Sequence, residues 1–184
     1  MHAGFFLTWQ LVLICAYHVT QKDAGRIVGM IHALVQIGLL YYGMSETACH
    51  IGLAYFMVEF LYSVMTRDLI GLVHSVVCSL TFWVITSYPT DRLFSLGYYL
   101  LSMELSTPMY HMAYFMRKHG NMKLAVQLFR VFAIFFFVVR VVMLPIHMYE
   151  YVNDIGYPMI FGIGGPFYAL QIYWMRLIAK KLVE

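Results

Sequence analysis

Charged side chains occur inside the hydrophobic segments of this sequence, where such residues are rare and usually functional. Glu59, Glu104 and Arg140 fall within three different apolar runs. At about 1.5 Å per helical residue, they lie at similar depths in a membrane. Because an unpaired buried charge is costly, we expect Glu104 to pair with Arg140, with Glu59 as the competing carboxylate. Such a pair either fixes the register of the helices or lines a polar site.

A second group of polar side chains lies nearer one membrane face. Each stands a few residues inside the end of a hydrophobic run: His18, His32, His74, His111 and Arg130. An imidazole can bind a metal, relay a proton or act as a nucleophile near neutral pH. Their spacing matches no metal motif, so we predict no metal site. We expect most of them to hydrogen-bond neighbouring helices or lipid headgroups.

Seven hydrophobic runs position these residues, and only short polar breaks separate them. Hydrophobic residues make up 62% of the 184 residues and charged residues 11%, against about 25% charged residues in soluble domains. Roughly 20 apolar residues form a membrane-spanning helix. We therefore predict an all-α, polytopic membrane helix bundle with about seven transmembrane helices, in one domain over residues 1–184. The predicted spans are Gly4–Val19, Arg26–Tyr42, His50–Met65, Leu69–Tyr88, Leu93–Met116, Leu124–Tyr149 and Gly156–Ile178.

The charged residues between the runs predict an orientation, because Lys and Arg collect on the cytosolic or matrix side. With seven spans, one side holds only Arg92, and the acidic residues Glu46, Asp91, Glu150 and Asp154 fall on that side. We expect the C-terminus on the basic, cytosolic or matrix side. Nothing in this charge pattern indicates nucleic-acid binding. The other side holds Lys22, Arg26, Arg67, Arg117, Lys118, Lys123, Arg176, Lys180 and Lys181.

Glycine and proline mark irregular places in two of the runs. Pro108 should kink the fifth run, because proline lacks a backbone N–H and clashes with the preceding turn. The seventh run contains Gly162, Gly164, Gly165 and Pro166. Small residues allow helices to pack closely, and a broken helix can also leave an opening for lipid. The three cysteines are far apart and indicate neither a disulfide framework nor a zinc motif.

Four segments, in order along the chain, resemble the TLC-domain family of membrane proteins, which includes the ceramide synthases. The most specific is Glu104–Gly120, ELSTPMYHMAYFMRKHG, which is similar to the family's Glu-x-Ser-Thr-Pro segment with a basic end. The others are RIVGMIHALV at Arg26–Val35, FFFVVRVVMLP at Phe135–Pro145 and QIYWMRLIAKK at Gln171–Lys181. The resemblance covers residues 26–181 and leaves residues 4–19 as an additional first helix.

The resemblance implies six helices around a lipid-accessible cavity, lined or braced by Glu104, Ser106, Thr107, Arg140 and His74. The hydroxyls of Ser106 and Thr107 would meet a lipid headgroup or bond back to their own helix. Ceramide synthases carry paired histidines, but this sequence has Val73, His74 and Ser75 at the matching place, with Glu59 where an aspartate is expected. Because His74 stands alone, enzymatic activity is in doubt.

The resemblance and the departures from it leave three functions to be considered. The first is a non-catalytic, lipid-binding protein that influences membrane lipid composition and contributes to lipid homeostasis. The second is a structural subunit of a larger membrane complex, for example in the mitochondrial inner membrane. The third is a lipid acyltransferase that uses His74. We expect no cofactor other than a bound phospholipid or acyl chain, partners among membrane lipids and other membrane subunits, and residence in the endoplasmic reticulum or the mitochondrial inner membrane.

Overall fold

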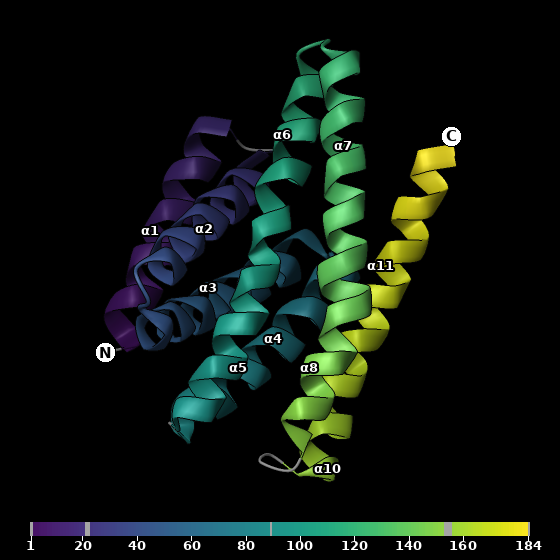
Figure 1. Ribbon diagram of the computed structural model, residues 1–184. Coiled ribbons are helices and arrows are strands. Elements are labelled where there is room, and N and C mark those ends of the chain that lie inside the picture. Colours follow the sequence, from purple (N-terminus) through teal and green to yellow (C-terminus); the bar gives the residue numbers. More distant parts are fainter. Residues whose placement is uncertain (1, 21–22, 89, 153–155, 184) are drawn as a thin grey trace. The chain divides into compact units, whose positions relative to one another are not determined.

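The computed structural model describes residues 2–20, 23–88, 90–152 and 156–183, and these residues form helices and no strands (Figure 1). The predicted all-α class is confirmed. Lys22, Pro89 and Asp154 lie outside the described residues, as does the side chain of His18.

The chain forms two compact units, Met1–Ser102 and Met103–Glu184. The N-terminal unit contains α1 (His2–Thr20), α2 (Ala24–Tyr41), α3 (Ser45–Thr66), α4 (Leu69–Ser87) and α5 (Asp91–Ser102). The C-terminal unit contains the 3-10 helix η2 (Met103–Ser106), α6 (Thr107–Lys118), α7 (Met122–Phe136), the π-helix η3 (Phe137–Met143), α8 (Leu144–Glu150), α10 (Tyr157–Met159), the π-helix η4 (Ile160–Gly164) and α11 (Gly165–Val183).

Four helices of the described chain are long and apolar enough to cross a membrane: Ala24–Tyr41, Ser45–Thr66, Leu69–Ser87 and Met122–Glu150. Each coincides with a run predicted to be a span, and a shorter apolar helix covers Leu7–Tyr17. The fifth and seventh runs are also helical but are interrupted by η2 and η4. The protein is an integral membrane helix bundle, and its seven crossings remain a prediction.

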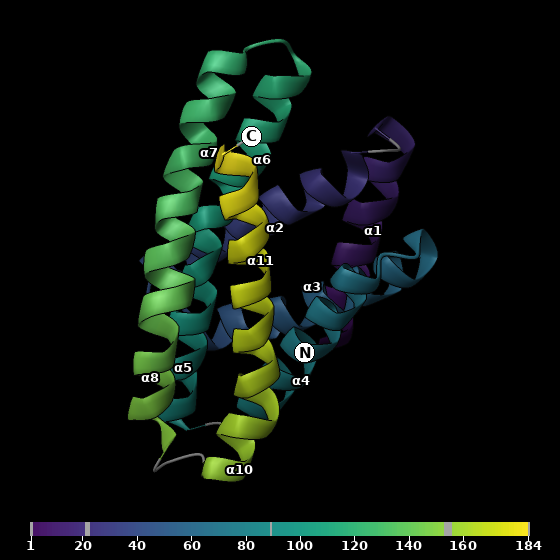
Figure 2. The same ribbon diagram turned by 90° about the vertical axis from the view of Figure 1, so that its right-hand side faces the viewer.

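Helix α3 is central to the N-terminal unit and packs against α1, α2, α4 and α5. It lies beside α4 in both ribbon views (Figures 1 and 2). Small residues bring the neighbouring helices close: a Cβ added at Gly25 of α2 would lie 2.8 Å from the Tyr62 ring, and one at Gly97 of α5 would collide with the sulfur of Cys49. Close backbone approach of this kind is typical of membrane bundles.

In the C-terminal unit, α6 and α7 form an antiparallel pair, and α11 packs along α7 and η3. Phe132, Ala133 and Phe136 of α7 pack with Ile178 of α11 in the hydrophobic core of this unit. Many large apolar side chains of α7 and η3 point outward, as lipid contact requires, among them Ile134 and Phe137, which are 64% and 47% exposed.

Each irregular helical segment in the C-terminal unit precedes a proline. The 3-10 helix η2 lies one turn before Pro108, and the two π-helices precede Pro145 and Pro166. A proline cannot bond the carbonyl four residues earlier, which for Pro145 is that of Val141. The hydroxyl of Tyr168 in α11 donates to this carbonyl at 3.2 Å. The Val141 carbonyl therefore has a donor, as a backbone group inside a membrane requires.

The glycines of the seventh run have two different surroundings. A Cβ added at Gly164 would overlap the terminal methyl group of the flexible Met148 side chain. An added Cβ at Gly162 or Gly165 would meet nothing within 4 Å. Of these three glycines, Gly164 is the one that a described side chain approaches.

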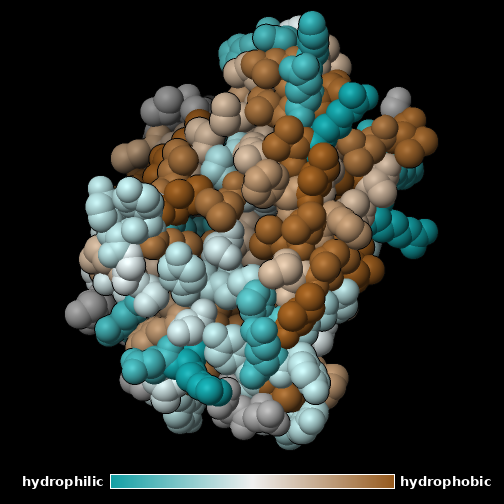
Figure 3. Space-filling model, in the orientation of Figure 1, coloured by the Kyte–Doolittle hydropathy of each residue, from teal (hydrophilic) through white to brown (hydrophobic). Residues whose placement is uncertain are grey.

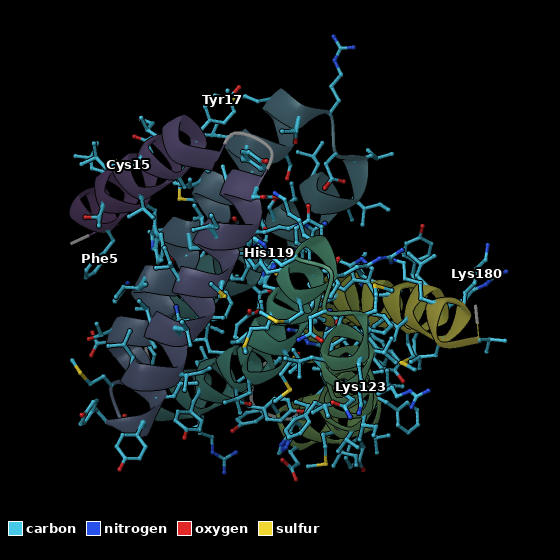
Figure 4. The ribbon with its side chains drawn as sticks, turned by 90° about the horizontal axis from the view of Figure 1, so that it is seen from above. Phe5, Cys15, Tyr17, His119, Lys123 and Lys180 are labelled. Atoms are coloured by element: carbon cyan, nitrogen blue, oxygen red, sulfur yellow. The ribbon has the colours of Figure 1, made fainter. Side chains whose placement is uncertain are left out.

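Basic residues collect at one end of the C-terminal unit. Figure 4 looks onto this end and labels His119 after α6, Lys123 in α7 and Lys180 near the end of α11. In Figure 3, teal side chains lie at this end, and brown side chains cover much of the visible face over α7 and α11. The distribution agrees with the charge pattern expected from the sequence.

Candidate functional site

Buried polar side chains form two clusters, one in each unit. The Arg140 cluster consists of Glu104, Thr107, the Met103 carbonyl, the Phe136 ring and Arg140 itself, which is 6% exposed. The His74 cluster consists of Tyr55, Glu59, His74 and Cys78 in α3 and α4.

In the Arg140 cluster, the guanidinium nitrogen Nη2 makes several polar contacts. Nη2 of Arg140 donates to the Met103 carbonyl at 2.9 Å and to the Thr107 hydroxyl at 3.3 Å, and lies 3.6 Å from Oε1 of Glu104. The Thr107 hydroxyl donates to Oε2 of Glu104 at 2.7 Å. The pair expected from the matched depths is therefore in place, and Thr107 links its two members.

The break at η2 explains how a backbone carbonyl joins this cluster. The 3-10 turn Met103–Ser106 interrupts the α-helix before Pro108, so the Met103 carbonyl accepts from Arg140 across the unit. The Ser106 hydroxyl donates back to the same carbonyl at 3.0 Å. Ser106 thus bonds to its own helix, whereas Thr107 has the carboxylate as its acceptor.

In the His74 cluster, a carboxylate holds the imidazole. Nδ1 of His74 lies 3.1 Å from Oε2 of Glu59, and the Tyr55 hydroxyl donates to Oε1 of Glu59 at 3.4 Å. Both carboxylate oxygens of Glu59 are engaged, one by His74 and the other by Tyr55. Cys78, one turn later on α4, lies on the same helix face as the imidazole and interacts with it.

His32 lies beside this cluster in a group of aromatic rings. Its ring stacks on Tyr55 with centroids 3.7 Å apart, and the edges of Trp9 and Phe56 complete the surroundings. His32 is 1% exposed, and neither ring nitrogen has a hydrogen-bond partner among the described residues. It therefore fixes the position of Tyr55, and through it that of Glu59.

The other expected site residues lie apart from these contacts. His111 is buried in α6, whereas Arg130 is exposed on α7. His32 and His74 belong to the N-terminal unit, and His111 and Arg130 to the C-terminal unit. Among the described residues, no three His, Cys, Asp or Glu side chains are grouped as ligands for a metal ion.

Sequence reasoning missed several polar members of these sites. Tyr55 stands four residues before Glu59, and Cys78 four residues after His74, a spacing that places each on its partner's helix face. These spacings could have identified both residues from the sequence. Gln171 of α11 is fully buried, and neither its amide nitrogen nor its amide oxygen has a partner in the described chain; only the packing of α11 identifies it.

The two clusters differ in what they can do chemically. Glu59 orients an imidazole that can take up a proton. The Arg140 cluster is neutralised by Glu104, yet Nε of Arg140 is buried without a partner in the described part of the chain. That nitrogen and the Gln171 amide can each hydrogen-bond an uncharged polar group inside the membrane.

Comparison with known proteins agrees with this arrangement. Residues 43–180, more than half of the chain, match the family model described as the TLC domain. Glu59, His74, Glu104 and Arg140 lie within the matched residues, whereas the RIVGMIHALV segment precedes them. Comparisons with curated proteins and with solved structures found no match. The chain belongs to the TLC-domain family.

Proposed function

We propose that this protein binds a membrane lipid within its helices, as a phospholipid or an acyl chain, and thereby influences membrane lipid composition. Membership in a lipid-related membrane family gives the general class. The lipid-binding role in this chain, its partners and its organelle are parts of the proposal, with the endoplasmic reticulum and the mitochondrial inner membrane as the two locations considered.

The observation that supports this proposal is the unpartnered amide of Gln171. Both of its polar atoms are fully buried without a hydrogen-bond partner among the described residues. An unsatisfied amide in an apolar environment is unfavourable by several kcal/mol, on the order of 2 to 7. An ester carbonyl of a lipid can accept from the amide nitrogen, and a lipid hydroxyl can donate to the oxygen.

Native mass spectrometry of the full chain, purified in mild detergent, tests the proposal. We expect a lipid to stay bound to the wild-type protein and to be retained less by Gln171→Leu, which removes the amide without emptying its space. Gln127→Leu is the matched control, because Gln127 is exposed on α7, and it should retain lipid like the wild type.

Two results would contradict lipid binding. Equal lipid retention by Gln171→Leu and Gln127→Leu would show that the Gln171 amide does not contribute to lipid binding. A protein that carries no lipid but holds other membrane proteins in a fixed ratio would favour a structural subunit instead.

A second function, lipid acyl transfer, is favoured by the contact between Glu59 and His74. A carboxylate that holds one imidazole nitrogen orients the ring as a general base, and the 3.1 Å distance meets that requirement. We expect His74→Ala to reduce consumption of an acyl-coenzyme A by the purified protein at least about 100-fold. Consumption that persists in His74→Ala would eliminate this mechanism.

A further inference from the structure

A thiol completes the His74 cluster. Cys78 follows His74 by four residues on α4, so both side chains lie on one face of the helix. The thiol forms no disulfide, is 3% exposed and interacts with the imidazole. Glu59 approaches the same imidazole from α3, at Nδ1. Carboxylate and thiol thus both lie beside the imidazole.

This set of groups is the one that activates a cysteine nucleophile. The carboxylate orients the ring, the imidazole removes the thiol proton, and the sulfur attacks a carbonyl carbon. The carboxylate itself is fixed, because Tyr55 donates to its second oxygen and the Tyr55 ring stacks on buried His32. The residues that hold Glu59 therefore come from α2 and α3, and the reacting pair from α4.

We propose that Cys78 is an acyl acceptor, which takes a fatty acyl chain from an acyl-coenzyme A thioester with His74 as general base and Glu59 as positioning residue. This proposal rests on the acyl transfer function above and names the group that carries the chain.

The transfer balances without any further reactant. The Cys78 sulfur forms a bond to the acyl carbon while the proton of the thiol passes to His74. The bond between that carbon and the sulfur of coenzyme A breaks, and His74 returns the proton to the departing thiolate. One thioester replaces another, so free coenzyme A is released and nothing is oxidised or reduced.

A thiol acceptor also resolves the difficulty of the single histidine. Val73 and Ser75 flank His74, so an imidazole that carried the acyl group would have no adjacent histidine to handle the proton. With the chain on Cys78, His74 keeps the proton-handling role. Burial of the sulfur shields the thioester from hydrolysis, and the neighbouring Glu59 and His74 side chains are 23% and 14% exposed.

The test uses the full chain in detergent, incubated with an alkyne-tagged palmitoyl-coenzyme A. We expect a covalent label that neutral hydroxylamine removes, located on Cys78 by peptide mass spectrometry of the wild-type protein. Cys78→Ala should lose the label. Cys49→Ala is the matched control, since Cys49 is also buried, in the neighbouring α3, and should keep it.

The rate of labelling tests the roles of His74 and Glu59. His74→Ala should slow labelling at least about 100-fold while Cys78 remains present. Glu59→Gln should slow it as well, and Glu59→Asp should restore part of the rate, which loss of packing alone would not predict.

Three outcomes would overturn the proposal: a wild-type map without acyl on Cys78, a label that persists in Cys78→Ala, or an unchanged rate in His74→Ala. Peptide mass spectrometry of the labelled wild-type protein tests the proposal even if Cys78→Ala does not fold. If the same preparation retains bound lipid but Cys78 stays unmodified, the acyl acceptor is wrong and lipid binding stands; if lipid is absent too, both proposals fail.

Discussion

Individual polar residues inside this membrane protein are stabilised chiefly by one another. Arg140 is compensated by Glu104, by Thr107 and by a backbone carbonyl that η2 makes available. In the N-terminal unit, His74 is compensated by Glu59. Because a buried charge without its partner is strongly unfavourable, whereas an apolar replacement of the whole pair can be neutral, single and double substitutions should behave differently.

Glu104→Gln should therefore lower the stability of the protein in detergent by about 3 kcal/mol, since Arg140 would keep its charge and lose the carboxylate. Adding Arg140→Leu to Glu104→Gln should recover part of that loss. Thermal unfolding followed by size-exclusion chromatography measures both. Glu150→Gln, at an exposed position at the end of α8, serves as the control and should change little. A double variant less stable than Glu104→Gln would count against the pair.

At the scale of elements, proline determines where the helices depart from α geometry. Without an N–H at Pro145, the Val141 carbonyl takes its hydrogen bond from Tyr168 of α11. This bond joins two helices through a backbone group that would otherwise face hydrocarbon unsatisfied. The π-helix η3 is thus part of the packing between α11 and the long helix of the C-terminal unit.

Tyr168→Phe should destabilise the protein by about 1 to 3 kcal/mol, because it leaves the Val141 carbonyl without its donor. In a Pro145→Ala background the backbone N–H is restored, and the same change should have a smaller effect. Tyr173→Phe is the control on the same helix, at an exposed tyrosine. Equal losses in the two backgrounds would show that the Tyr168 hydroxyl does not serve this carbonyl.

The contact between α3 and α5 depends on a glycine. Gly97→Ala should destabilise the N-terminal unit by about 1 to 3 kcal/mol, because the new methyl group would collide with the sulfur of Cys49. Cys49→Ala removes that sulfur and should relieve most of the loss when the two changes are combined. Gly38→Ala, where an added Cβ meets nothing within 4 Å, should be tolerated. Thermal unfolding compares the four proteins, and no relief in the double variant would refute the collision.

For the whole molecule, hydrophobicity alone predicted the helical class and most helix positions, because lipid requires long apolar helices. Counting residues from the ends of the hydrophobic runs also predicted the Glu104 and Arg140 pair, because each helical residue adds a fixed depth. Neither pattern predicted the link from Tyr168 to Val141 or the burial of Gln171, which arise from packing between segments distant in sequence. The pairing of Glu59 with His74 was missed because similar depth in the membrane suggested Arg140 as a partner for Glu59. In the structure, α3 packs against α4, and Glu59 contacts His74 on that neighbouring helix.

Orientation in the membrane is the remaining property that the charges predict for the whole chain. The helix from Met122 to Glu150 is long and apolar enough to cross, so His119 before it and Tyr149 near its end should face opposite sides. Lys180 should share the side of His119 if the C-terminus lies on the basic side.

To test this orientation, single cysteines replace these three exposed residues in a protein whose own cysteines are changed to serine. In sealed vesicles of known orientation, a membrane-impermeant maleimide should label His119→Cys and Lys180→Cys from the cytosolic or matrix side only, and Tyr149→Cys from the other. Labelling of His119→Cys and Tyr149→Cys from the same side would show that this helix does not cross, and labelling of all three from reversed sides would show that the charge pattern misassigns the orientation.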